Sequence, residues 1–119
     1  MLALLRSALH LLWMGLTVVP WALAVLAAAP CVKSATVYRM CRGWLQQVVW
    51  MAGPLLGIRN RVQGWHNLPT DPNARVVLLV KHQSTWETFA MPVLMPRPLA
   101  YVFKRELLSI PFFGWALFL

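Results

Sequence analysis

The sequence predicts an α/β protein in which a membrane-associated helical hairpin precedes the first part of a mostly parallel sheet with flanking helices. Three observations support this fold class. Sixty per cent of the 119 residues are hydrophobic and only 12% are charged, whereas soluble domains carry about 25% charged residues. Two long apolar segments occupy the first half of the chain. In the second half, short apolar runs alternate with helix signals.

Charge restricts the class of partner. Eleven Lys and Arg residues against three acidic residues give a net charge of +8, which suits an anionic lipid surface. The basic residues are dispersed and no zinc-finger, helix-turn-helix or RNA-binding signature occurs, so we expect a membrane lipid partner and no nucleic acid. Cys31 and Cys41 lack the spacing of a metal site, and neither a metal nor another cofactor is predicted.

The first apolar segment, residues 7–32, contains no Lys, Arg, Asp or Glu and is long enough to cross a bilayer core, which needs about 20 residues. A secretory signal peptide, a spanning anchor and a shallow hairpin are all compatible with it. The second segment, residues 43–58, is interrupted by Gly53-Pro54 and reaches only roughly 24 Å, short of the ~30 Å hydrocarbon core.

The flanking charges favour the hairpin. Basic residues lie between the two segments and after the second one, at Lys33, Arg39, Arg42, Arg59 and Arg61. A full crossing by the first segment would place residues 33–42 against the positive-inside tendency. We therefore predict that residues 1–57 form a hairpin that dips into one leaflet, with a core helix as the alternative for the second segment. Tryptophans 13, 21, 44 and 50 fit an interfacial aromatic belt.

Residues 58–119 are the predicted start of an α/β domain that is incomplete at its C-terminus. An apolar, β-branched run at residues 75–80 is typical of a strand buried on both faces of a parallel sheet. Residues 84–91 suit a short helix, which three prolines then end. Residues 99–103 form a second apolar run, and another helix start follows at residues 104–106.

This strand, helix, strand order predicts a site at one edge of the sheet. Both strands are parallel after a right-handed crossover, so His82 and Lys104 each follow the carboxyl end of a strand, where ligands bind in open α/β sheets. His82 is a potential base, and Lys104 and Arg105 are potential phosphate-binding cations. A solvated helix start is the alternative interpretation for both cations.

His82 and Glu87 suit acid–base chemistry. An imidazole can remove a proton from an alcohol, and a carboxylate that accepts its other N–H stabilises the imidazolium that forms. This requires His82 to precede the helix, because residues i and i+5 lie about 140° apart on one helix. Ser84, the predicted N-cap of an S-x-x-E capping box, places it there. In the alternative interpretation, Glu87 only caps the helix.

The stretch Lys81-His-Gln-Ser-Thr-Trp-Glu87 resembles the His-x4-Asp motif of the glycerophospholipid acyltransferases. Residues 62–69 and 103–115 resemble two further blocks of that family, and the whole chain looks like the N-terminal half of its bacterial members that acylate 1-acyl-glycerol-3-phosphate. The resemblance implies acyl transfer from an acyl thioester, acyl-CoA or acyl carrier protein, to this lysophosphatidate, giving phosphatidate. It also implies a membrane location, at the cytoplasmic face of the bacterial inner membrane.

The resemblance further implies that His82 is the general base, that Glu87 stands where the family has Asp, and that Lys104 and Arg105 line the acceptor site. Glu adds one methylene, and Lys81 replaces a common Asn. The family's Glu-Gly-Thr-Arg block does not occur, so we expect an incomplete fragment that is inactive alone. A lipid A late acyltransferase and a non-catalytic membrane anchor or interaction module are the alternative functions.

Overall fold

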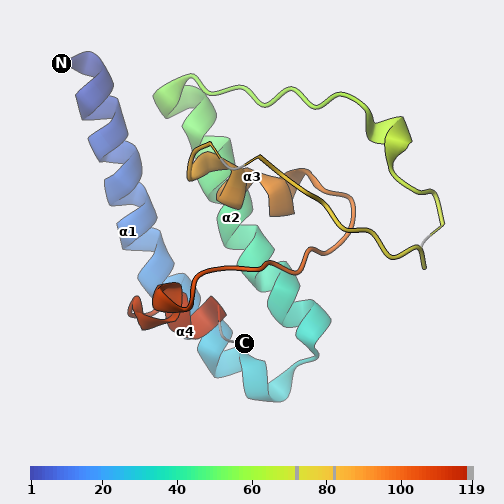
Figure 1. The fold of residues 1–119 in the computed structure, drawn as a ribbon. Helices are drawn as coiled ribbons and strands as arrows, with labels where there is room; N and C mark the ends of the chain where they lie inside the picture. The colour runs from blue at the N-terminus through green and yellow to red at the C-terminus, as the bar shows by residue number, and fades with distance from the viewer. Residues whose placement is uncertain (72, 82, 118–119) are drawn as a thin grey trace.

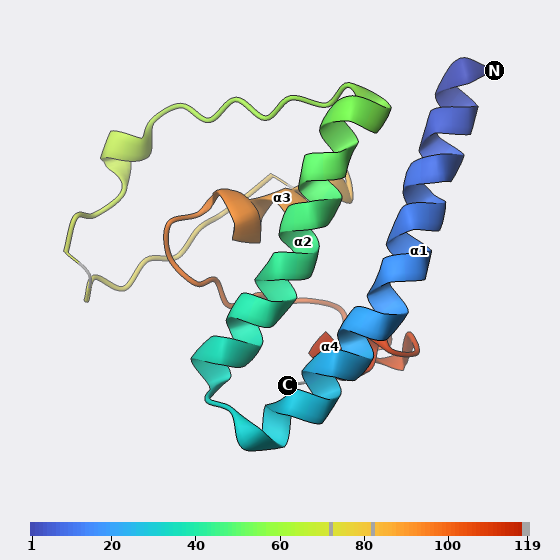
Figure 2. The ribbon, with the colours of Figure 1, turned by 180° about the vertical axis from the view of Figure 1, so that it is seen from behind.

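The computed structural model describes residues 1–71, 73–81 and 83–117. Its elements are α1 (Leu2–Ala28), η1 (Ala29–Cys31), α2 (Ser34–Leu56), η2 (Trp65–Asn67), α3 (Trp86–Leu94), η3 (Arg105–Ser109) and α4 (Phe113–Leu117). Helices α1 and α2 lie side by side and run in opposite directions (Figures 1 and 2). Helix α3 packs on α2, and α4 packs on α1.

The second helix of this pair is longer than the sequence predicts. Helix α2 begins at Ser34 and has 23 residues, so its length is roughly 34 Å at 1.5 Å per residue. The added residues precede the apolar segment 43–58 and include Arg39 and Arg42. Among the described residues, only Leu2–Cys31 has the length and composition to cross a membrane, in agreement with the prediction that the second apolar segment is too short to do so. Pro54 lies inside the last turns without ending the helix, and Gly57 ends it because its φ of 72° is the left-handed conformation that glycine adopts readily.

Helix α1 carries most of the exposed apolar surface. By length and composition, one helical segment of the described residues, Leu2–Cys31, is suited to cross a membrane. Its large side chains face outward at many positions, with Leu4, Leu11 and Leu16 exposed by 76%, 66% and 66%. A contiguous apolar surface of this kind marks a contact with lipid or protein.

A row of polar contacts joins α1 to α2. Among the described residues, five side-chain hydrogen bonds cross between the helices, at four positions about one turn apart along α1: His10 with the Val48 carbonyl (3.1 Å), Trp13 to Gln47 (2.6 Å), Trp44 and Gln47 to Thr17 (3.1 Å each) and Trp21 to the Met40 carbonyl (2.8 Å). Such bonds hold helices together even where the surroundings are apolar. The aromatic-belt prediction is wrong for Trp44, which is 6% exposed, because its ring fills the interior of the helical layer.

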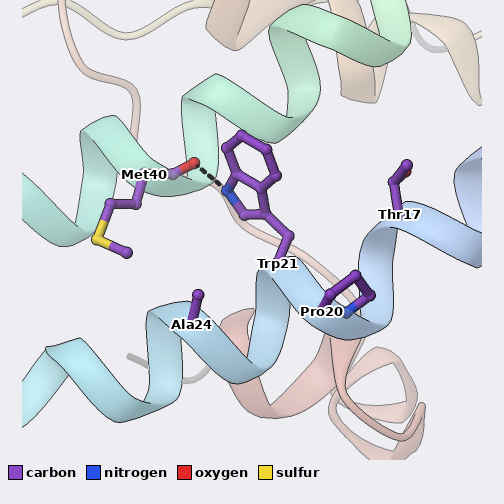
Figure 3. A pocket seen from close by; sticks show the side chains of 5 residues that line it. All are labelled: Thr17, Pro20, Trp21, Ala24 and Met40. Carbon is purple, nitrogen blue, oxygen red and sulfur yellow. Dashed lines mark hydrogen bonds between the residues drawn. The ribbon is translucent and has the colours of Figure 1, made fainter.

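Beside this row lies a shallow groove between the two helices (Figure 3). It has a volume of about 360 Å³ and is lined by Thr17, Pro20, Trp21, Ala24 and Met40. The Trp21 indole lies across the gap to reach the Met40 carbonyl (Figure 3). Of the predicted site residues that the structure describes, Ser84, Glu87, Lys104 and Arg105, none lines this groove.

The predicted sheet is not confirmed, since the described residues contain no β-strand. Residues 75–80 and 99–103, the predicted strands, have no regular secondary structure, and the chain between α2 and α3 extends away from the helices (Figures 1 and 2). Val77, Leu79 and Val102 are exposed by 86%, 95% and 105%. A strand needs a neighbouring strand for its backbone hydrogen bonds, and neither run has one among the described residues.

Candidate active site

Glu87 lies in the first turn of α3, held by contacts with Ser84. The Glu87 carboxylate accepts hydrogen bonds from the Ser84 backbone N–H at 2.9 Å and from the Ser84 hydroxyl at 2.8 Å. The Ser84 hydroxyl in turn accepts a bond from the Trp86 N–H at 3.2 Å. The N-cap is Thr85, one residue after the predicted Ser84, and the helix runs from Trp86 to Leu94, while Ser84 and Glu87 bond to each other as in a capping box. The prediction that Pro92 ends the helix is wrong, because Pro92 lies inside it.

The same contacts set the charge of Glu87. The Ser84 hydroxyl, followed by the backbone amides of Glu87, Ser84 and Gln83, holds the pKa of this carboxyl below its ordinary value, against a smaller opposing effect of desolvation. Glu87 is therefore ionised at neutral pH. Its carboxylate points back toward Ser84, which follows the predicted base, His82, by two residues.

The structure describes the other predicted site residues but not the predicted base. His82, the predicted general base, lies outside the described residues. Lys104 directly precedes η3 and Arg105 begins it, and both side chains are exposed. Within residues 83–117, no hydrogen bond joins either cation to Glu87.

Sequence reasoning missed the residues that fix α3 in place. Arg42 of α2 donates from Nε to the Pro92 carbonyl and from a terminal guanidinium nitrogen to the Val93 carbonyl, both at 2.9 Å. The Trp44 and Phe89 rings meet edge to face with centroids 6.2 Å apart. In sequence, Arg42 is simply one of several basic residues between apolar segments, and nothing in the pattern marks it as a partner of α3.

Further contacts hold the ends of the two apolar runs. Arg97 donates hydrogen bonds to the carbonyls of Pro69 (2.8 Å), Ala74 (3.3 Å) and Asp71. One guanidinium therefore binds three carbonyls that precede residues 75–80. The Tyr38 hydroxyl of α2 accepts a bond from the Leu99 N–H at 3.1 Å, so the second run also begins at a tethered point.

The sequence of this chain is similar to that of a curated protein. The chain is 39% identical to a curated 1-acyl-sn-glycerol-3-phosphate acyltransferase of Pseudomonas aeruginosa. The resemblance predicted from the sequence motifs is confirmed. The match covers 95% of this chain, and hence the stretch from Lys81 to Glu87, but 43% of the relative. The chain thus spans less than half the length of that acyltransferase. No family model and no solved structure matches it.

Proposed function

We propose that this protein transfers an acyl chain from an acyl thioester to the free hydroxyl of 1-acyl-glycerol-3-phosphate, giving phosphatidate. The observation that carries the proposal is the 39% identity, over 95% of the chain, to an enzyme named for acylation of this acceptor. The ionised Glu87, anchored at the first turn of α3 five residues after His82, supplies the carboxylate that the chemistry needs.

In the proposed mechanism, His82 takes the proton of the acceptor hydroxyl while the oxygen attacks the thioester carbonyl. The new C–O bond forms, the C–S bond breaks, and the departing thiolate receives the proton from the imidazolium. Glu87 provides the counter-charge for that imidazolium. Lys104 and Arg105 bind the acceptor phosphate, the Arg as a two-pronged donor. The donor is acyl-CoA or acyl carrier protein.

The proposal includes the surroundings of the site. Residues 75–80 and 99–103 become neighbouring strands of a mostly parallel sheet, which would cover the apolar side chains exposed at Val77, Leu79 and Val102. The exposed apolar surface of α1 and the net charge of +8 support attachment to an anionic membrane, at the cytoplasmic face of the inner membrane.

The test uses the protein at its natural length in isolated membranes, with an acyl thioester and lysophosphatidate as substrates and phosphatidate as the measured product. We expect His82→Ala to lower the rate by about 10²-fold or more, the range of general-base catalysis. Glu87→Gln lowers it strongly because the imidazolium loses its counter-charge, and Glu87→Asp retains part of the rate. The rate is divided by the amount of membrane-bound protein.

Matched control variants are His66→Ala, which removes an exposed imidazole in η2, and Asp71→Asn, which removes an exposed carboxylate outside α3. Both should keep the parental rate. Full activity in His82→Ala would overturn the mechanism. Acylation of a lipid A precursor in place of lysophosphatidate would identify the alternative acyltransferase, and absence of any transfer would leave a membrane anchor.

A further inference from the structure

Arg42 of α2 contacts the C-terminal end of α3. Its guanidinium makes two hydrogen bonds of 2.9 Å, to the carbonyls of Pro92 and Val93. Carbonyls in the last turn of a helix have no partner within the helix, and a cation at this end also interacts favourably with the helix dipole. Arg42 is half-buried, so water competes with these bonds less than it does at the surface.

Helix α3 depends on contacts of this kind for its position. It has nine residues and contains Pro92, and an isolated helix of that length is not stable in water. Helix α2 supplies its surroundings: the Trp44 ring meets Phe89 at 6.2 Å, and Ala90 is 3% exposed. Arg42 is the polar part of this support and the only part directed at the C-terminal carbonyls among the described residues.

The carboxylate of Glu87 sits at the other end of the same short helix, in its first turn. Because Glu87 and the two carbonyls that Arg42 binds belong to the same short helix, a tilt or shift of that helix also displaces Glu87. A displacement of about 1 Å in a catalytic group can cost roughly 10²-fold in rate.

We propose that Arg42 is a positioning residue: from the hairpin helix α2 it fixes the axis of α3 and so places the Glu87 carboxylate against the catalytic base. The inference rests on the proposed acyl transfer for its kinetic consequence. Its structural part, the restraint of α3 by Arg42, does not depend on that function.

The experiment compares Arg42→Met with Arg39→Met in the protein at its natural length, in membranes. Both variants remove one positive charge from α2, but the Arg39 side chain is exposed and donates to Thr36 of its own helix. We expect Arg42→Met to lower kcat per membrane-bound molecule by roughly tenfold to a hundredfold with little change in KM. Arg39→Met keeps both constants, and Arg42→Lys recovers part of the rate because one ammonium replaces a two-pronged donor.

Two further measurements separate positioning from a loss of folded protein. The acidic limb of the pH profile of kcat/KM should move to lower pH in Arg42→Met, since an imidazole that loses a nearby carboxylate becomes less basic. Amide hydrogen exchange of α3 in detergent micelles should speed up in Arg42→Met and not in Arg39→Met.

Unchanged kcat and unchanged exchange in Arg42→Met would overturn the proposal. If the parent protein transfers no acyl chain, the proposed function has failed, yet the exchange comparison still decides whether Arg42 restrains α3. If Arg42→Met does not accumulate in membranes, Arg42→Gln, which retains one neutral donor, takes its place in both measurements.

Discussion

The helical layer formed by α1 and α2 and the chain between α2 and α3 differ in how their backbone N–H and C=O groups are hydrogen-bonded. In α1 and α2 most peptide groups bond within their own helix, and side-chain bonds such as that from Trp44 to Thr17 hold the two helices together. Residues 75–80 are equally apolar but remain irregular and exposed. Apolar composition alone therefore does not produce ordered structure; a helix can form from local bonds, whereas a strand requires a partner.

The largest effect that this comparison predicts is at Trp44. Its ring is 6% exposed and contacts Phe89 and Phe113, with centroids 6.2 and 6.3 Å away. Trp44→Ala should lower the free energy of unfolding by about 3–5 kcal/mol, the cost of an aromatic cavity. Chemical denaturation of the 119-residue chain in detergent micelles, followed by circular dichroism, measures it.

Leu79→Ala is the matched change in the irregular region. Since Leu79 is 95% exposed, its truncation should alter the free energy of unfolding by no more than about 0.5 kcal/mol. A loss comparable to that of Trp44→Ala would mean that residues 75–80 are packed in this chain. The contrast between the two regions would then no longer hold.

A second pair of substitutions tests close packing near the C-terminus. A Cβ added at Gly114 would lie 2.4 Å from the Leu108 carbonyl oxygen and 2.6 Å from that of Leu107. Gly114→Ala should therefore destabilise the chain by about 1–3 kcal/mol. Gly15→Ala, where nothing lies within 4 Å of the new carbon, should stabilise α1 by about 0.5–1 kcal/mol. Thermal unfolding of both variants gives the comparison, and equal effects would contradict it.

The smallest predicted effect concerns the pH dependence of the start of α3. The pKa of Glu87 is lower in the folded state than its ordinary value, chiefly because of the Ser84 hydroxyl. Its contribution to stability is therefore fully present above the ordinary pKa and is lost as the pH falls through the folded value. Carbon-13 NMR titration of the carboxyl measures the shift. Ser84→Ala should raise the pKa, and an unchanged titration would refute this cause.

Parts of the candidate site follow directly from local sequence. Ser84 and Glu87 stand three residues apart, and this spacing places a carboxylate over the preceding backbone amide wherever a helix starts. The helix start was displaced by one residue because side-chain capping and the first helical backbone conformation need not coincide. The predicted sheet does not follow from local sequence in this way, because each strand depends on hydrogen bonds to a neighbouring strand.

By itself the sequence determined the apolar N-terminal helix, the short helix that carries Glu87 and the His-x4-Glu motif, because helical periodicity and capping are properties of neighbouring residues. Only the tertiary structure decided that α2 starts at Ser34, that Trp44 is buried, and that Arg42 holds the end of α3. These features join residues up to 51 positions apart. Contacts over such separations depend on how whole helices pack, which no local pattern encodes.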